Sequence, residues 1–264
     1  AWSSRANANV GGVTCCQVDL RDVDQISKAF TDFKPDIVIH AAAVSSAVGC
    51  LKDPEQARQV NATATRFLAE LSQRHGARLV FTSTDLVFDG RQGHYGETDA
   101  ATPITVYGHS KAAAERSVVR CDQFALRISL LFAPAINGRP AFFDHQLKAL
   151  QEGSRCFLFE DEWRTPLSTD LAARGLLEVA ASDVKGILHL AGPEIMTRFE
   201  MGRRLAKAIG VDPDLVIANR REDNEGDEPR PRDVSLRCDR WCQLFPDFPR
   251  PDYEQSLRNL GLGV

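Results

Sequence analysis

The feature that most restricts the fold of this 264-residue chain is a set of short apolar segments without polar alternation. They are PDIVIHAAA (residues 35–43), ARLVFTST (77–84) and QFALRIS (123–129). Residues 23–30, before the first segment, and 55–74, between the first two, carry helical patterns. Strands buried on both faces give such unbroken apolar runs, whereas half-exposed strands alternate. The pattern therefore predicts an α/β protein with a doubly wound, Rossmann-like parallel sheet that helices cover on both faces.

The second half of the chain is less regular. Helices are expected at residues 141–153 and 168–182, and a late strand in GILHLAG (186–192). We assign residues 1–133 to an NAD(P)-binding domain and 134–264 to a smaller substrate-binding lobe, with 163–192 returning to the main sheet. The charged, proline-containing segment 220–233 is interpreted as a solvated loop.

Composition excludes several classes of partner. The net charge of −4 gives no electrostatic basis for binding nucleic acid or anionic membrane surfaces. No apolar run reaches the length of about 18 residues that a membrane span needs. The seven cysteines are an odd, scattered set, which favours free thiols in the reducing cytoplasm, with a zinc site at Cys238 and Cys242 as the lesser alternative. An organelle stays open as a location, because the sequence begins at Ala1.

A dinucleotide-binding sheet should open with a strand, a glycine-rich turn and a helix. No such turn is present, since the VGG at residues 10–12 lies outside a strand-to-helix connection, and AWSSR (1–5) reads as the tail of a second strand. We expect a fragment that lacks roughly 25–30 residues, the length of one strand–helix unit. The rival hypothesis is a complete protein that never bound a dinucleotide.

The expected strand ends carry the candidate cofactor contacts, because ligands of parallel sheets bind beyond the carboxyl ends of the strands. The residues at these ends are Asp19 and Leu20, the small residues Ala41, Ala42 and Ala43, and the run from Thr82 to Asp85. Asp19 could accept a hydrogen bond from an adenine amino group, and the alanines would let a cofactor approach the backbone.

Tyr107 and Lys111 lie four residues apart at an expected helix start, so their side chains share one helix face. An ammonium group one turn from a phenol favours the phenolate and makes proton transfer easier near neutral pH. Thr84 would then bind a substrate oxygen while Tyr107 gives it a proton. The alternative is a packed tyrosine beside a solvated lysine, since this spacing alone is a weak motif.

In addition, the sequence resembles the extended short-chain dehydrogenases/reductases, and among them the dTDP-4-dehydrorhamnose reductase branch. The resemblance rests on VDLRD (18–22), PDIVIHAAA, NATATRFLAE (61–70), FTSTDLVFDG (81–90), ETDAATPITVYGHSKAAAE (97–115) and LRIS (126–129). It implies reduction of a nucleotide-linked 4-keto sugar with NAD(P)H. By this resemblance Tyr107 is the catalytic acid, Lys111 its partner, Thr84 the tuning hydroxyl and Asp85 a neighbour of the sugar. The matching cofactor positions are Asp19, Leu20, Ala41, Ala42, Ala43, Thr82, Tyr107 and Lys111.

Two departures from that family pattern matter. The glycine-rich turn is absent, and Leu130 stands where the reductases have an aromatic residue that contacts the substrate. The same motifs also occur in the regulatory β subunit of methionine adenosyltransferase, which lacks that aromatic residue too. A non-catalytic, NADP-binding regulatory subunit is therefore the alternative function, with a methionine adenosyltransferase catalytic subunit or a second copy of the chain as protein partner.

The cofactor is expected to be NADP, with NAD as the alternative. An NAD site places an acidic residue at the end of the second strand, whereas an NADP site places an arginine nearby. AWSSRAN (1–7) has no acid and offers Arg5 with two serines, which are donors suited to a phosphate. Two other polar residues, His40 and Asn61, are interpreted as structural, Asn61 by bonding a nearby loop.

Overall fold

The computed structural model describes residues 1–5, 8–136, 140–223 and 228–263. This part of the chain divides into two compact units. The first unit comprises Ala1–Ser83, Thr105–Leu126 and Leu176–Ile187, and the second Thr84–Ile104, Arg127–Gly175 and Leu188–Val264. Residues 84–104 and 127–133, assigned above to the cofactor domain, thus group with the second unit, and the functional assignment of the two parts stays a prediction.

The first unit alternates strands and helices along the chain. Its elements are β1 (Trp2–Ser3), β2 (Asn9–Val10), β3 (Val13–Thr14), β4 (Cys16–Gln17), α1 (Val23–Phe33), β5 (Ile37–His40), α2 (Ala47–Lys52), α3 (Pro54–Ala57), the π-helical turn Arg58–Thr63, α4 (Ala64–His75), β6 (Arg78–Thr84) and α5 (Val106–Arg120). The helix expected over residues 55–74 is therefore a succession of α3, a π-helical turn and α4. The strand expected to end at Asp19 and Leu20 is split into β3 and β4.

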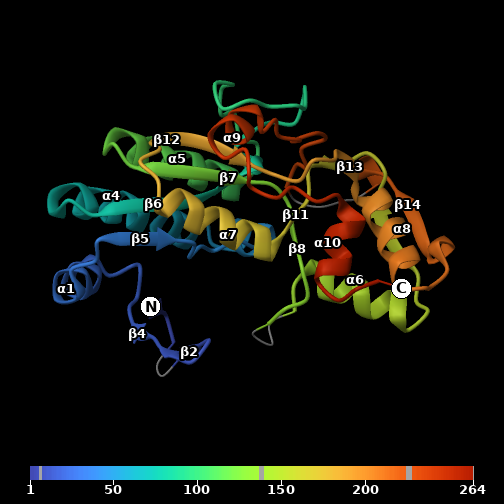
Figure 1. Ribbon diagram of the computed structural model, residues 1–264, viewed down its shortest axis with the longest axis horizontal. Coiled ribbons are helices and arrows are strands. Elements are labelled where there is room, and N and C mark those ends of the chain that lie inside the picture. The colour runs from blue at the N-terminus through green and yellow to red at the C-terminus, as the bar shows by residue number, and fades with distance from the viewer. Residues whose placement is uncertain (6–7, 137–139, 224–227, 264) are drawn as a thin grey trace. The chain divides into compact units, whose positions relative to one another are not determined.

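The main sheet has the order β12-β7-β6-β5, with β7 at Phe124–Ile128 and β12 at Gly186–Leu190 (Figure 1). β5 and β6 are parallel, from Ile37 opposite Arg78 to His40 opposite Phe81. The expectation of a parallel α/β sheet is confirmed. The late strand β12 lies next to β7 in this sheet.

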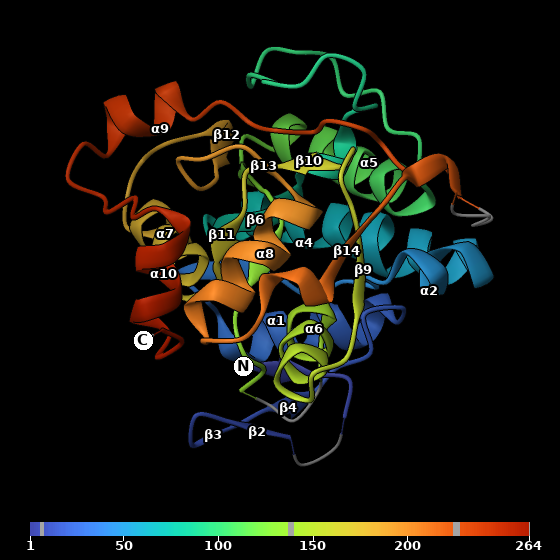
Figure 2. The same ribbon diagram turned by 90° about the vertical axis from the view of Figure 1, so that its right-hand side faces the viewer.

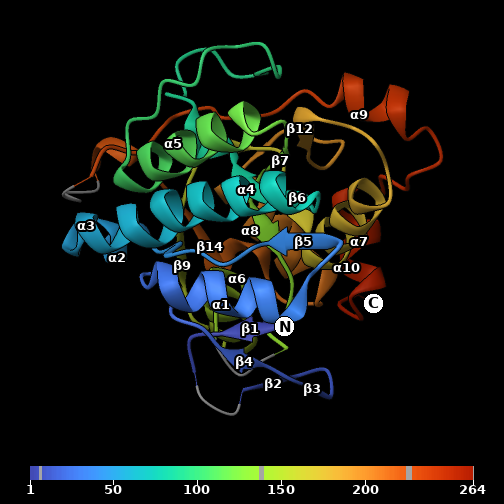
Figure 3. The same ribbon diagram turned by 90° about the vertical axis from the view of Figure 1, so that its left-hand side faces the viewer.

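Two apolar clusters hold the first unit together. Leu79 and Phe81 of β6 pack with Ala114 and Val118 of α5, so this helix covers one face of the sheet. A second cluster joins α1 to α4 through Ile26, Phe30, Ala64, Leu68 and Leu71. Figure 3 shows α5, α4 and α1 one below another, with β5 between the levels of α4 and α1. The helices are thus fixed on the sheet by the apolar periodicity that predicted them.

The outer side of β5 has no strand beside it among the described residues. β5 pairs with β6 only, while β1 pairs in parallel with β4 in a separate two-stranded sheet. Ile37 and Ile39 of β5 are 47% and 41% exposed. Apolar side chains at this exposure are unusual for a strand of a parallel sheet, which is normally covered on both faces.

The second unit contains the remaining elements. They are the 3₁₀ turn Asp85–Val87, β8 (Leu131–Phe132), α6 (Phe142–Gln151), β9 (Cys156–Phe159), β10 (Trp163–Arg164), β11 (Leu167–Ser168), α7 (Thr169–Ala180, which begins here and ends in the first unit), β13 (Met196–Thr197), α8 (Arg198–Ala208), the 3₁₀ turns Pro213–Leu215 and Arg221–Asp223, β14 (Val216–Asn219), α9 (Asp239–Leu244) and α10 (Tyr253–Asn259). β9 and β14 run parallel and side by side next to α8 (Figure 2).

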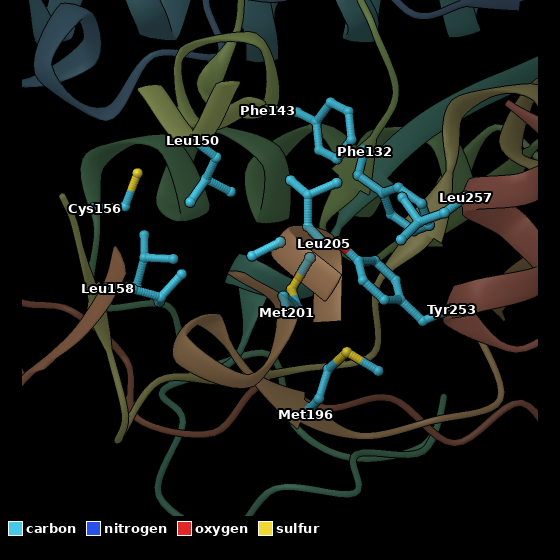
Figure 4. Close-up of a cluster of buried hydrophobic side chains, with 12 residues drawn as sticks. Phe132, Phe143, Leu150, Cys156, Leu158, Met196, Met201, Leu205, Tyr253 and Leu257 are labelled. Carbon is cyan, nitrogen blue, oxygen red and sulfur yellow. The ribbon is translucent and has the colours of Figure 1, made fainter. Parts of the chain in front are cut away.

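The core of the second unit is an apolar cluster around α8. Met201 and Leu205 of α8 lie between Phe132, Phe143 and Leu158 (Figure 4). Leu130 is half-buried and packs against this cluster. Its side chain therefore contributes to the core of this unit.

The described ranges hold no helix with the length and apolar character needed to cross a bilayer. All seven cysteines are free thiols. Within those same ranges, no three His, Cys, Asp or Glu side chains are grouped so that they could hold a metal ion.

Candidate active site

The helix α5 places the candidate acid and its partner on one face. Thr105 caps the helix, because its hydroxyl oxygen accepts a hydrogen bond from the backbone N–H of Gly108 at 3.0 Å. Tyr107, Lys111 and Glu115 follow at intervals of four residues. Tyr107 is half-buried, whereas Lys111 and Glu115 are 2% and 3% exposed. The face that carries the Tyr–Lys pair is therefore the buried face of the helix.

Lys111 is not a solvated surface lysine. Its Nζ lies 4.1 Å from the ring centroid of Phe81 on β6, close enough for a cation–π contact. Burial lowers the pKa of Lys111 to about 7, while the Glu115 carboxylate raises it. The alternative in which the lysine is merely solvated is therefore wrong.

The end of β6 is bonded to the same helix. Ser83 Oγ donates a hydrogen bond to Glu115 Oε1 at 2.5 Å, and both side chains are buried. Ser83 immediately precedes Thr84 in the chain. This hydrogen bond joins Ser83, near the end of β6, to the middle of α5. Both residues belong to the first unit.

Asn61 fixes the loop after β5 to the start of α5. Its amide accepts from Val44 N at 2.8 Å, donates to Val44 O at 3.0 Å and donates to Ser110 Oγ at 3.0 Å. Ser110 Oγ donates in turn to Tyr107 O. Asn61 is fully buried and lies in the π-helical turn, a local geometry that often occurs at functional sites. Its expected role in bonding a nearby loop is confirmed.

The three alanines expected to approach a cofactor precede Val44. Ala41 and Ala42 are exposed and Ala43 is half-buried. His40, just before them, is buried with Nε2 3.0 Å from Thr65 Oγ1, and burial lowers its pKa to about 3. It is thus a neutral, hydrogen-bonded structural histidine.

Thr82 carries a hydroxyl that fits a cofactor. Its Oγ1 is buried and has no hydrogen-bond partner in the part of the chain that the structure describes. A buried hydroxyl without a partner is costly, so a bound polar group would stabilise it. Among the expected cofactor contacts, Thr82 is thus the one whose unpartnered hydroxyl favours a bound dinucleotide.

The remaining expected cofactor residues lie near the N-terminus. Asp19 is paired with Arg21, Oδ2 to Nη2 at 2.5 Å, and hydrogen bonds from Arg21 lower the pKa of Asp19 to about 2. An adenine amino group would therefore share this carboxylate with Arg21. Leu20 is half-buried at the edge of the α1–α4 cluster, and Arg5 is exposed, with its backbone N–H bonded to Ser3 Oγ.

Thr84 and Asp85 belong to the second unit. Thr84 Oγ1 donates to Asp85 Oδ1 at 3.1 Å, and Asp85 Oδ2 accepts from Ser129 Oγ at 2.9 Å. Both residues are buried, and burial raises the pKa of the Asp85 carboxyl despite the nearby Arg164. Because Tyr107 and Lys111 lie in the first unit, the convergence of Thr84 with this pair stays a prediction.

A cluster of arginines around one glutamate was not predicted from the sequence. Glu162 is buried, and its carboxylate lies 3.1 Å from Arg164, 3.4 Å from Arg230 and 3.9 Å from Arg198. Burial is the main cause that lowers the pKa of Arg198 to about 10; the Glu162 carboxylate opposes this effect, and the charges of Arg164 and Arg230 add to it. No local motif could have indicated this cluster, because Arg164, Arg198 and Arg230 are far apart in the sequence.

A parallel α/β sheet, with the helix that carries Tyr107 and the buried Lys111 packed on an inner strand, defines a protein of the Rossmann-like α/β class. Residues 2–261 match the family model described as RmlD substrate binding domain. The chain therefore belongs to this family.

Several relatives are similar to this chain over most of its length. A "Probable low-salt glycan biosynthesis reductase Agl14" of Haloferax volcanii is 32% identical over 82% of this chain and 74% of the relative. A "Methionine adenosyltransferase 2 subunit beta" of Danio rerio is 31% identical over 91% and 76%. A "dTDP-4-dehydrorhamnose reductase" of Mycolicibacterium smegmatis is 28% identical over 94% and 76%.

Solved structures share the fold. A hypothetical dTDP-4-dehydrorhamnose reductase from Sulfolobus tokodaii has a TM-score of 0.84 and 29% identity, covering 96% of this chain and 89% of that one. The dTDP-4-dehydrorhamnose reductase of Bacillus anthracis, solved in complex with NADP, has a TM-score of 0.83 and 24% identity, covering 92% and 86%. These likenesses confirm the Rossmann-like fold class predicted from the sequence.

Proposed function

We propose that this protein is an NADPH-dependent reductase of a nucleotide-linked 4-keto sugar, similar to dTDP-4-dehydrorhamnose reductase. The observation that carries the proposal is the burial of Lys111 against Phe81, one helical turn after Tyr107. The bound nicotinamide would supply a hydride to the carbonyl carbon. Tyr107 would give the carbonyl oxygen its proton, the Lys111 ammonium would make the phenol more acidic, and Thr84 would hydrogen-bond the same oxygen.

We propose NADP as the cofactor, with NAD as the alternative. The groups that would hold it are the Thr82 hydroxyl, the backbone at Ala41–Ala43, Lys111, Asp19 with Leu20, and Arg5 for a 2′-phosphate. The Bacillus anthracis reductase was solved with NADP, which supports this choice. The open side of β5, with Ile37 and Ile39 exposed, is where a further strand, glycine-rich turn and helix would complete the site.

We propose that the nucleotide-sugar substrate is bound by the second unit. Asp85, held by Ser129, would lie beside the sugar. Arg164, Arg198 and Arg230 lie around Glu162, and Arg164 is also 3.8 Å from Asp85, so three guanidinium groups contact two carboxylates. Guanidinium groups suit a diphosphate. This excess of positive charge supports a phosphate-linked substrate. We also propose a cytoplasmic location, since seven free thiols suit a reducing compartment.

The test incubates the protein with NADPH and a dTDP-4-keto-6-deoxy sugar. We expect the NADPH absorbance to fall with time, and Tyr107→Phe to lower kcat by about 10²-fold or more, because the proton donor is lost. Absence of turnover with this and several other nucleotide-linked keto sugars would refute the proposal.

The second candidate function is an NADP-binding regulatory subunit. It is favoured by the relatives named methionine adenosyltransferase 2 subunit beta, and by Leu130, which packs into the core where the reductases carry an aromatic residue. Under this hypothesis the chain would bind a methionine adenosyltransferase catalytic subunit, and Tyr107→Phe would leave that binding intact. A homodimer is the other assembly to test. Co-purification with the catalytic subunit, measured for the wild type and for Tyr107→Phe, distinguishes the two functions.

A further inference from the structure

Glu115 is a buried carboxylate that the catalytic proposal does not use. It lies on α5 one turn beyond Lys111 and two turns beyond Tyr107, on the same helix face. Its side chain is 3% exposed, although glutamate is rarely buried to this degree without a partner. Its position raises the question of what the carboxylate does there.

Ser83 holds this carboxylate in place. The Ser83 hydroxyl donates to Glu115 Oε1 at 2.5 Å, and Ser83 is itself 3% exposed near the end of β6. The carboxylate of Glu115 is therefore oriented by the strand that also contributes Phe81 to the surroundings of Lys111.

The groups that act on Lys111 come from three elements. The Phe81 ring on β6 faces the ammonium, and His40 at the end of β5 is neutral, with a pKa of about 3. Tyr107 and Glu115 lie on α5 itself. Burial favours the neutral amine at Lys111, whereas the Glu115 carboxylate favours the ammonium.

We propose that Glu115, oriented by Ser83, is a positioning residue that opposes the loss of the Lys111 proton on burial and holds Lys111 beside Tyr107. Its effect on the protonation of Lys111 is a property of the folded chain and needs neither cofactor nor substrate. Its consequence for catalysis rests on the proposed reductase function. If Lys111 loses its proton, the Tyr107 phenol loses the cation that makes it a better acid.

The experiment measures the protonation of Lys111 directly. The protein is labelled with ¹³C,¹⁵N-lysine, the side-chain signals are followed by NMR from pH 5 to 10, and Lys111→Arg assigns the Lys111 signal. We expect Glu115→Gln to lower the Lys111 midpoint by about one pH unit or more, because an opposite charge at this range shifts a pKa by about 1–3 units. Glu115→Asp, which keeps the charge but shortens the side chain, should give a Lys111 midpoint between those of the wild type and Glu115→Gln.

Two controls limit the interpretation. Lys28, which pairs with Asp32 on the surface of α1, should titrate identically in all variants. Glu70→Gln, which removes a carboxylate paired with Arg66 on α4, should leave the Lys111 midpoint unchanged. A wild-type midpoint for Lys111 in every folded Glu115 variant would overturn the proposal, and Glu115→Asp keeps the test open if Glu115→Gln does not fold.

A kinetic measurement separates this inference from the reductase function. If the wild type reduces its substrate, Glu115→Gln should move the alkaline limb of the kcat profile to lower pH, by the shift that NMR records, and Glu115→Asp should restore part of it. If the wild type shows no turnover but the NMR midpoint shifts, the reductase function fails while the role of Glu115 stands. A shifted NMR midpoint with an unchanged kcat profile would refute the catalytic part.

Discussion

Lys111 is only 2% exposed, and its burial makes the free energy of unfolding depend on pH. The pKa of Lys111 is lowered by burial from 10.5 to about 7, so between these values the unfolded chain binds a proton that the folded chain does not. The free energy of unfolding therefore rises with pH across this window, by at most about 1.4 kcal/mol per pH unit from this group.

We expect urea unfolding to show this slope between pH 7 and 9, and Lys111→Met to flatten it. The comparison is between slopes, so a general loss of stability in the variant does not disturb it. A slope that is the same in wild type and variant would mean that Lys111 is protonated in the folded protein throughout this range.

Asn61 makes a second prediction at the scale of one residue. Its side chain bonds both backbone groups of Val44 and the Ser110 hydroxyl, so Asn61→Ala leaves several buried polar groups without partners. We expect a loss of about 2–3 kcal/mol in the free energy of unfolding, measured in urea. Asn259→Ala, at an exposed site on α10, should change it by less than about 0.5 kcal/mol.

At the scale of the element, the start of α5 contributes to stability through its cap and also holds Tyr107, the proposed proton donor. Thr105→Ala removes the cap one residue before the turn that holds Tyr107, and we expect a cost of about 1 kcal/mol, or about 2–4 °C in Tm. Asp252→Ala removes the equivalent cap of α10 and serves as the matched control. Both variants should lose similar stability by calorimetry, but only Thr105→Ala should lower kcat. An equal kcat in the two variants would mean that the cap does not position Tyr107.

At the scale of the whole molecule, acid should destabilise both units through buried histidines. His40 in the first unit and His189 in the second are buried, and burial lowers the pKa of each to about 3. Between pH 6.5 and 3 the unfolded chain binds protons that the folded chain does not, so the free energy of unfolding falls as the pH falls. Each histidine contributes at most about 1.4 kcal/mol per pH unit.

We expect urea midpoints to decrease between pH 6.5 and 4.5, and the dependence to become shallower in His40→Gln and in His189→Gln. Exposed His109→Gln is the control and should keep the wild-type dependence. If the two buried variants also keep it, other groups cause the acid sensitivity.

Local sequence determined those features that depend on neighbours in the chain. Unbroken apolar strands separated by amphipathic helices were enough to predict the parallel sheet, and four-residue spacing was enough to put Tyr107 and Lys111 on one helix face. The motifs around them were enough to indicate the family. These inferences hold because helix and strand periodicity fixes which side chains share a face.

Only the tertiary structure decided what surrounds those side chains. The packing of Lys111 on Phe81, the bond from Ser83 to Glu115 and the approach of Arg198 and Arg230 to Glu162 all join residues far apart in the chain. Burial and the resulting pKa values depend on these distant neighbours, which local periodicity does not encode. The sequence therefore indicated which side chains share one face of α5, and packing decided the surroundings of the lysine on that face.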